Sequence, residues 1–420
     1  MSEPTESPDA PLGPLDGIKI VDWTIWQQGP VAGAMMGDLG AEVIKIEERE
    51  KGDGGRQMFL VPGGDGSSPY WEMNNRNKKS FNVDLKHPEG VELVRKLIDQ
   101  ADVFIQNFRP SVAEKVGLDY ETLKARNPKL IYASASAFGP EGPERKARAY
   151  DLIGQARSGF LLRDGKDEPD IPDGGMADQM GAIMLAYAVM CGLMARERHG
   201  IGQKVDTSLL GSMMWLRGLP FARTLMNDPR RQRSDMGQHM QSKVPTRTDP
   251  GNPLWNTYKC GDGRWMALAI LATDPHWPVV LEALGQPPEL TDNPAYQDHW
   301  GRCSHAGEIV AVLDPLFASQ PRDYWLDRLI AKGDLPVCAI NTTEEAANDP
   351  QALINGYITE YDHPHYGKLK LPGFPVTLSE TPARIHCRAP EFGEHTEELL
   401  LDRLGLDWDE VSRLREAGVI

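Results

Sequence analysis

The chain has 420 residues, 61 acidic and 45 basic, which gives it a formal net charge of −16 at pH 7. A chain of this length buries a large core and normally divides into two or more domains. The negative charge argues against a general binder of nucleic acid or of an anionic membrane, and it requires any phosphate site to be local.

The N-terminal stretch is acidic and rich in Pro and Ser, without the basic and then apolar pattern of a secretory signal. We therefore expect residues 1–10 to be a disordered leader. The cysteines are scattered and never form a C-x-x-C pair, so neither a disulfide framework nor a zinc site is indicated. This usage favours a reducing cytoplasm. The five cysteines are Cys191, Cys260, Cys303, Cys338 and Cys387.

Two short β-branched runs flank a helical segment near the start of the chain. The runs cover residues 17–22 and 41–47, and residues 30–39 between them have helical spacing. Strand, helix and strand in this order predict a parallel βαβ unit. The connecting turn holds the bulky Trp26 and the single Gly29 in place of G-x-G-x-x-G, so a dinucleotide cofactor is not expected.

The strand and helix pattern continues beyond this unit. Residues 89–99 predict an amphipathic helix, and residues 101–106 and 130–135 predict further strands. In a doubly wound parallel sheet, ligands collect outside the carboxyl ends of the strands. The loops that follow Asp22, Glu47 and Gln106 should therefore share one rim, where we expect Trp26, Gln27 and Asn107 to converge.

Asp178 stands at the start of the most apolar run in the chain, residues 180–195. The run is shorter than the roughly 20 residues that span a bilayer, so a helix buried on all sides is the simpler interpretation. Considered alone, Asp178 is best interpreted as a helix N-cap. A strand from Gln203 that enters another helix should follow.

The second half of the chain predicts a smaller domain. Residues 217–253 have little periodicity, whereas Asp262-Gly263 between apolar runs indicates a β-hairpin. A closing helix is expected at residues 396–404. We predict a large α/β domain at residues 11–217, a linker arm at 218–250, a small α+β domain at 251–340, and a segment at 341–420 that returns to the large domain.

Several separate strings carry a family resemblance over residues 11–420. In this order they resemble the class III (CaiB/BaiF) CoA-transferases, which include the formyl-CoA transferases. The strings lie at residues 15–22, 40–47, 77–80, 106–110, 150–159, 174–179, 202–203 and 393–396.

The resemblance implies a CoA transfer from an acyl-CoA donor to a free carboxylic acid. Asp178 would be the nucleophile, kept ionised by the amides at its helix start, and Gln27 would donate to a substrate oxygen. A carboxylate suits this role, because its anhydride and thioester intermediates keep the energy of the thioester. The CoA thioester is a substrate, and no permanently bound cofactor or metal is required.

The resemblance also implies an open Rossmann-like sheet, a small α+β domain and an interlocked dimer, either a homodimer or a heterodimer with a related subunit. Basic and aromatic side chains would contact CoA at the sheet rim. Arg49 stands in for the base that usually follows the Lys-Ile-Glu string, where this chain has Glu48. The expected CoA contacts are Trp26, Arg49, Val83, Lys86, Asn107, Phe108, Lys115, Arg148, Tyr150 and Asp151.

Two alternatives remain open at this point. A 2-methylacyl-CoA racemase would need a histidine opposite Asp178, but Tyr150-Asp151 stands where that group of enzymes has His-Asp. A non-catalytic subunit of a hetero-oligomeric transferase is the other alternative, although it would not need Asp178.

The acceptor acid is a separate question. Succinyl-CoA is one possible donor, and wide apolar side chains near the site would favour a bulky or aromatic acceptor over oxalate. The glycine-rich flap of the formyl-CoA transferases has no counterpart near Asp262. The residues expected to form the apolar wall are Trp23, Trp26, Tyr70, Trp71, Met176 and Met180.

Overall fold

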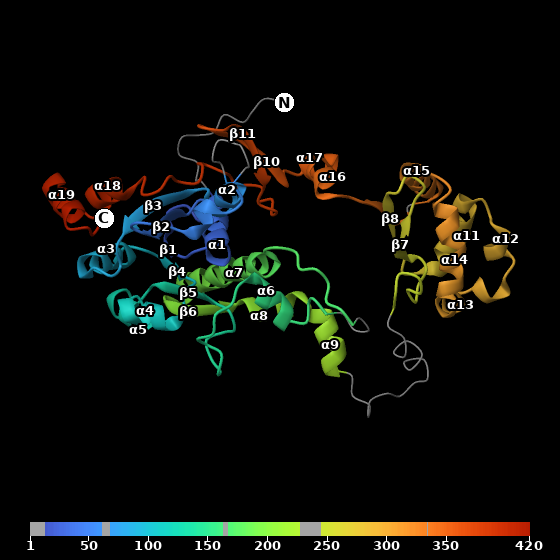
Figure 1. Cartoon of the computed structure of the whole chain (residues 1–420), viewed down its shortest axis with the longest axis horizontal. Helices are drawn as coiled ribbons and strands as arrows, with labels where there is room; N and C mark the ends of the chain where they lie inside the picture. The colour runs from blue at the N-terminus through green and yellow to red at the C-terminus, as the bar shows by residue number, and fades with distance from the viewer. Residues whose placement is uncertain (1–12, 61–67, 163–166, 227–244, 334) are drawn as a thin grey trace. The chain divides into compact units, whose positions relative to one another are not determined.

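The computed structural model describes residues 13–60, 68–162, 167–226, 245–333 and 335–420, so the expected leader lies outside the described residues. The chain forms two compact units (Figure 1). One contains Met1–Met226 and Ile354–Ile420, and the other contains Asn227–Leu353. The sequence-based boundaries stood at residues 217/218 and 340/341. Residues Gly218–Met226, expected in the linker arm, form helix α9.

The first unit is built on a six-stranded parallel sheet with strand order β3-β2-β1-β4-β5-β6. This is the doubly wound order, in which the connections diverge between the first and fourth strands. The predicted α/β, Rossmann-like class is confirmed. The strands are β1 Lys19–Trp23, β2 Glu42–Glu48, β3 Lys78–Val83, β4 Val103–Gln106, β5 Ile131–Ser136 and β6 Gln203–Ser208.

Helices cover both faces of the sheet, which explains why its strands are apolar on both sides. Ile20 and Val43 pack on one face with α1 (Gln28–Asp38) and α7 (Met176–His199). Val21 and Ile44 pack on the other face. That second face is covered by α3 (Pro88–Asp99), α4 (Pro110–Val116), α5 (Tyr120–Arg126) and the C-terminal α19 (Trp408–Glu416).

Helix α7 is long and apolar enough, by length and composition alone, to cross a membrane. Its Ala182, Leu185 and Val189 are nevertheless buried against the sheet and α1. We therefore describe it as the core helix of this unit. Shorter elements surround it: η1 Gly54–Gln57, α2 Pro69–Asn75, α6 Asp151–Arg157 and α8 Leu209–Leu216.

The C-terminal segment returns to the first unit and covers the edge strand β3. The Asn77 side chain accepts from the backbone N–H groups of His386 and Cys387. The N–H of His395 donates to the Ser80 carbonyl, and the Thr396 hydroxyl accepts from the N–H of Asn82. The backbone groups of the edge strand are thus occupied by a segment about three hundred residues later in the chain.

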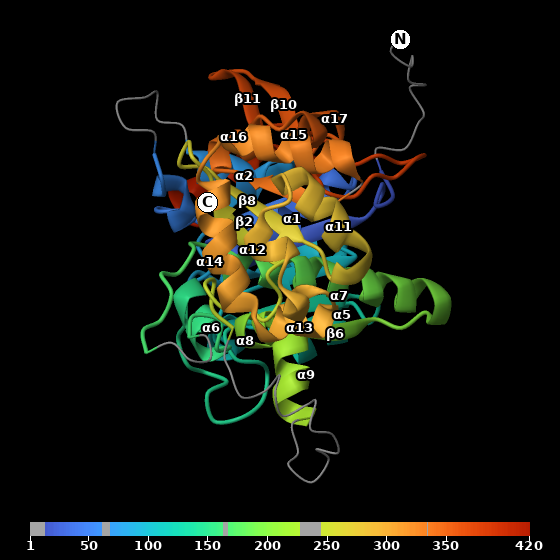
Figure 2. The same ribbon diagram turned by 90° about the vertical axis from the view of Figure 1, so that its right-hand side faces the viewer.

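Before this contact the C-terminal segment forms a hairpin of β10 (Ile358–His363) and β11 (Gly367–Pro372), which lies beside α2 (Figure 1, Figure 2). The Tyr361 hydroxyl donates to Glu72 of α2 at 2.6 Å. The predicted closing helix is only partly α-helical, with α18 at Thr396–Glu398 followed by a π-helical turn at Leu399–Arg403.

The second unit pairs a three-stranded antiparallel sheet with helices, as expected of a small α+β domain. The predicted hairpin around Asp262 is confirmed by β7 (Trp255–Lys259) and β8 (Trp265–Ala269), and β9 (Val337–Ile340) pairs with β8. The helices are α11 Thr273–Leu284, α12 Pro288–Thr291, η3 Pro294–Tyr296, α13 His299–Ser304, α14 Ala306–Phe317, α15 Arg322–Lys332, α16 Thr343–Ala347 and α17 Pro350–Ile354.

Candidate active site

A cleft of about 310 Å³ opens at the carboxyl ends of the strands, where β1 and β4 meet. This is the point at which doubly wound sheets bind ligands. The described lining comes from the loops after β1, β4 and β5, the stretch before α6, and the first residues of α1, α4, α7 and α8. It consists of Ile25, Trp26, Gln28, Asn107, Phe108, Arg109, Pro110, Val112, Ala135, Ser136, Ala137, Arg145, Ala147, Arg148, Ala149, Tyr150, Asp178 and Leu209.

Gln27 lies beside this cleft, between the start of α1 and the start of α7. Its amide packs so closely on Gly175 that a Cβ there would come within 2.7 Å of Nε2. Gln27 Nε2 also donates to Gln179 Oε1 at 3.3 Å. Because Gly175 and Gln179 flank Asp178 along the chain, the Gln27 amide lies close to the Asp178 turn.

The N-terminus of α7 is capped by Asp151, which stands in α6. One Asp151 oxygen accepts from the backbone N–H groups of Ala177 and Asp178 at 2.6 and 3.0 Å, and the other accepts from Gly175 at 3.1 Å. The residue in the N-cap position is Gly175, with φ of 80°. The N-cap interpretation of Asp178 is therefore wrong. The Asp151 carboxylate, which was expected to contact CoA, forms the cap of α7.

The protonation of Asp178 also differs from the expectation. Burial, and after it the negative charge of Asp151, raises the pKa of Asp178 to about 7. The expectation that helix amides keep Asp178 ionised fails for a physical reason, because Asp151 already accepts from those amides and brings a like charge. A partly buried carboxyl with a pKa close to neutral is typical of a functional site.

The other side chains that were predicted to contact CoA form two groups, those that line the cleft and those that lie away from it. Trp26, Asn107, Phe108, Arg148 and Tyr150 line the cleft, so the predicted convergence of Trp26 and Asn107 is confirmed as geometry.

Four others lie away from the cleft lining. Arg49 donates from Nε to the main-chain oxygen of Ile420 at 3.0 Å. Val83 is fully buried in the core, which removes its side chain as a CoA contact. Lys86 and Lys115 are exposed at the surface.

Two tryptophans that were expected to form the apolar wall of the site are buried in the core instead. Trp23 is buried and stacks on Phe108, with ring centroids 4.3 Å apart. Trp71 is buried beneath the Arg56 guanidinium, which lies 3.8 Å from its ring centroid. Of the six wall residues, Trp26 is the one that lines the described cleft.

The other three wall residues lie close to Asp178 without lining the cleft. Met176 and Met180 pack on a small cluster formed by Ala177, Leu209 and Met213. Burial, followed by the negative charge of Asp178, raises the pKa of Tyr70 well above its ordinary value. The Tyr70 hydroxyl therefore stays protonated.

Sequence reasoning missed two basic residues of the cleft, Arg109 and Arg145. Arg109 follows the predicted strand directly in the string Asn-Phe-Arg-Pro, so its position at the rim could have been inferred. Arg145 stands in an irregular stretch without periodicity, and its place became visible only in the structure.

Comparisons with known proteins agree with this architecture. The sequence model of CoA-transferase family III matches residues 15–396. The chain is 32% identical to succinyl-CoA–D-citramalate CoA-transferase of Chloroflexus aurantiacus, over 99% of this chain and 100% of that protein. It is 32% identical to succinyl-CoA:glutarate CoA-transferase of Mus musculus, over 97% and 91% of the two chains. A crystal structure of a CaiB/BaiF family protein from Brucella suis superposes with a TM-score of 0.77 and 30% identity, covering 94% of this chain and 100% of that one.

Proposed function

Since this chain belongs to CoA-transferase family III and is a CoA-transferase, we propose that it moves CoA from succinyl-CoA to a free carboxylic acid through covalent intermediates on Asp178. One observation carries the proposal. Among the described residues that line the cleft, Asp178 is the one carboxylate. Its pKa of about 7 leaves it available as an anion at neutral or higher pH.

Four acyl transfers complete the reaction, each with CoA thiolate or a carboxylate as the leaving group. An Asp178 oxygen attacks the thioester carbonyl, the C–S bond breaks, and a mixed anhydride and CoA thiolate result. The thiolate attacks the Asp178 carbonyl, releases the donor acid and leaves an aspartyl-CoA thioester. The acceptor carboxylate attacks that thioester and expels the thiolate. The thiolate then attacks the acceptor carbonyl, which gives the new acyl-CoA and restores the Asp178 carboxylate.

The surroundings of Asp178 suit these steps. A carboxylate that has lost part of its hydration is a stronger nucleophile than one in water, and the raised pKa reflects that loss. The Gln27 amide lies at the same turn and can donate to the oxygen that becomes negative during each attack. Arg109, Arg145 and Arg148 can pair with the phosphates of CoA in an otherwise acidic chain.

Small dicarboxylic acids are the acceptors that we propose. A bulky aromatic acid was favoured by the expected apolar wall, but Trp23 and Trp71 are buried in the core. Two relatives at 32% identity are named for D-citramalate and glutarate. Assays of CoA transfer from succinyl-CoA to glutarate, D-citramalate, oxalate and benzylsuccinate test this acceptor class. Turnover restricted to benzylsuccinate would overturn the proposal of a small acceptor.

The racemase alternative has no support in this geometry. A racemase needs a second acid or base that faces the α-carbon from the side opposite Asp178. None of the described residues of the cleft lining is a histidine. A 2-methylacyl-CoA incubated in deuterated water with the protein should therefore retain its α-proton.

Chemical trapping tests the covalent step directly. The protein is mixed with succinyl-CoA, treated with hydroxylamine and digested, and the peptide that contains Asp178 is analysed by mass spectrometry. We expect a hydroxamate on Asp178 in the native protein and none in Asp178→Ala. Asp173→Ala is the matched control, because Asp173 is an exposed acid in the same loop. A native peptide that stays unmodified while CoA transfer proceeds would exclude the aspartyl intermediate.

We also propose that the protein is a dimer of identical chains. Helices α7, α8 and α9 leave large apolar side chains exposed. A monomeric protein seldom leaves such a surface in contact with water. These side chains are Tyr187, Trp215, Leu219, Leu225 and Met226. Size-exclusion chromatography with light scattering should give twice the chain mass of 46.6 kDa. A monomeric mass would contradict this proposal.

A further inference from the structure

Side chains hold the main chain of the β1–α1 loop at Thr24, Ile25 and Trp26, the three residues that precede Gln27. We propose that Lys45, Asp53 and Asn107 are positioning residues that fix this loop, and with it the Gln27 amide and the Trp26 ring, relative to Asp178. This inference rests on the proposed CoA transfer and goes beyond it, because none of the three groups acts on substrate in this role.

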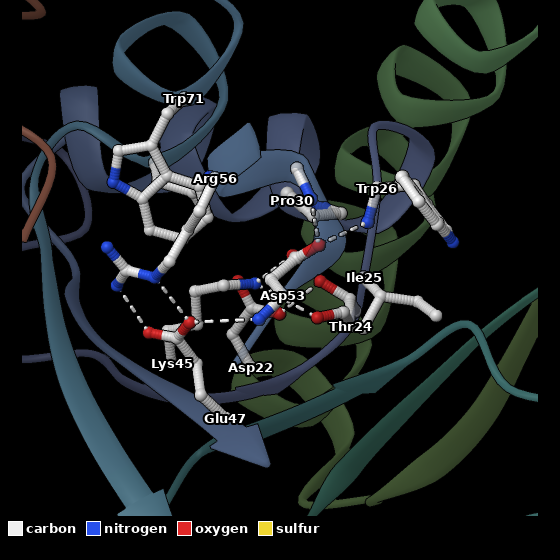
Figure 3. A network of polar contacts seen from close by, with 12 residues as sticks. Asp22, Thr24, Ile25, Trp26, Pro30, Lys45, Glu47, Asp53, Arg56 and Trp71 are labelled. Carbon is white, nitrogen blue, oxygen red and sulfur yellow. Dashed lines mark hydrogen bonds and ion pairs between the residues drawn. The ribbon is translucent and has the colours of Figure 1, made fainter. Parts of the chain in front are cut away.

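The contacts form a continuous set along the loop. Lys45 Nζ donates to the Thr24 carbonyl at 2.9 Å, and Asp53 Oδ1 accepts from the Trp26 N–H at 3.1 Å (Figure 3). Between them, Asn107 Oδ1 accepts from the Ile25 N–H at 2.9 Å, and Asn107 Nδ2 donates to the Ile25 carbonyl at 2.7 Å. Four main-chain groups of three consecutive residues are thus bound by side chains.

Lys45 and Asp53 are also partners of each other. Their charged groups lie 2.8 Å apart, and their side chains are 0% and 1% exposed. Burial works against the charge of Lys45, but Asp53 and the neighbouring acids raise its pKa above the ordinary value. The pair therefore stays ionised in the core, and each member extends one hydrogen bond to the loop.

A second layer supports the acid of this pair. The Asp53 N–H donates to Glu47 at 3.2 Å, and Arg56 binds both Glu47 oxygens at 2.7 and 2.9 Å (Figure 3). Ser80 donates to Glu47 at 2.6 Å. Asp53 is therefore bound to Lys45 and Glu47 of strand β2, and Glu47 is held in turn by β3, which makes Asp53 a rigid anchor for the loop.

The loop needs an anchor because its backbone is unfavourable. Trp26 has φ of 66°, a left-handed conformation that side chains other than glycine seldom adopt. Its ring lies against Gly54, where an added Cβ would come within 2.6 Å of the indole. We use the term clamp for the hydrogen bonds that join the loop to Lys45, Asp53 and Asn107. Without the clamp, Trp26 would relax toward negative φ and move the following residue, Gln27. A displacement of about 1 Å at a catalytic group is enough to lower the rate roughly 100-fold.

The positioning role of Asn107 differs from the role that the sequence resemblance implied, which was a contact with CoA. Asn107 does line the cleft, but its amide oxygen and nitrogen are both bound to Ile25. A residue that binds CoA affects mainly KM, whereas a residue that positions Gln27 affects mainly kcat. The two assignments therefore predict different kinetics.

Asn107→Asp is the first test variant, because it keeps the shape while turning the Nδ2 donor into an oxygen that faces the Ile25 carbonyl. Lys45→Met combined with Asp53→Asn is the second, and it removes the buried ion pair without leaving an isolated charge. Arg76→Met combined with Asp38→Asn is the matched control, because it also removes a buried ion pair without leaving an isolated charge. The Arg76–Asp38 pair is buried in the same unit, but it binds Asn77 rather than this loop.

We expect both test variants to lower kcat at least about tenfold while KM for succinyl-CoA changes less than about threefold. In a Gln27→Ala background the same changes should lower kcat less than about twofold, because the group being positioned is already gone. The control variant, Arg76→Met with Asp38→Asn, should stay within about twofold of the native kcat in both backgrounds. A rise in KM at constant kcat, or the full loss in the Gln27→Ala background, would overturn the positioning role.

Hydrogen exchange gives a readout that needs no activity. The amides of Ile25 and Trp26 should exchange at least about tenfold faster in both test variants than in the control variant, as expected of a locally opened loop. Unchanged exchange would refute the clamp even if CoA transfer is established. Faster exchange in a protein that transfers no CoA would support the clamp and refute the proposed function.

Discussion

Replacing Asp178 with Asn is expected to stabilise the protein while it abolishes the proposed chemistry. The carboxyl has a pKa of about 7 in the folded chain, against an ordinary value of 3.8. The fold therefore disfavours the charged form of Asp178. The charged carboxylate therefore lowers the free energy of unfolding. This penalty is absent well below pH 3.8, where the carboxyl is protonated in both the folded and the unfolded states. It grows as the pH rises from about 4 to about 7, and it is constant above that.

The size of the effect follows from the pKa difference. A shift of about 3 units at 1.36 kcal/mol per unit corresponds to about 4 kcal/mol above pH 7. Asn carries no charge at any pH and escapes this penalty. The free energy of unfolding of Asp178→Asn should therefore exceed that of the native protein by about 4 kcal/mol at pH 8.5 and about 2 kcal/mol at pH 5.5.

Urea denaturation at these two pH values, followed by tryptophan fluorescence, measures the difference. Asp173→Asn serves as control, since its exposed side chain should change the free energy of unfolding by less than about 0.5 kcal/mol. An advantage of Asp178→Asn that is equal at both pH values would show that ionisation is not its source. A loss of stability at pH 8.5 would refute the reasoning altogether.

Three further predictions concern the same site. Asp151→Asn removes a negative charge beside Asp178 and weakens the cap of α7, so the midpoint of the kcat against pH profile should fall below about 7, while thermal denaturation shows a loss of about 1 kcal/mol. Gly175→Ala places a Cβ within 2.7 Å of Gln27 Nε2 at a left-handed φ of 80°, so steady-state kinetics should show kcat at least about tenfold lower. Arg145→Gln should raise KM for succinyl-CoA, and the increase should shrink at high salt because the lost contact is electrostatic.

The fold was largely predictable because it depends on local periodicity. The apolar runs around Ile20 and Val43 gave the first two strands, and the helical spacing between them gave α1. The rim at the carboxyl ends followed from the rule for parallel sheets, which brought Trp26 and Asn107 together. The helix α19 was missed, although Asp407 caps it in the manner typical of a helix start.

The site was less predictable because its side chains act across the chain. Asp151 caps a helix that begins 25 residues later, and no local pattern records such a contact. Val83 was expected at CoA, yet it shares a strand face with Phe81 and belongs to the core for that reason. Lys45 stands in an apolar strand as a charge whose partner, Asp53, becomes evident only when the loop is folded.

The covering of β3 by residues near 386–396 has a consequence for how the protein is made. Strand β3 leaves the ribosome about three hundred residues before the segment that satisfies Asn77, Ser80 and Asn82. At roughly 5–20 residues per second, synthesis of the intervening chain takes roughly 15–60 seconds. During that interval the nascent sheet has an open edge, which is the feature that pairs with other chains and aggregates. Expression of this protein should therefore depend on chaperones that act during translation, and truncation before residue 386 should give aggregates rather than a smaller soluble domain.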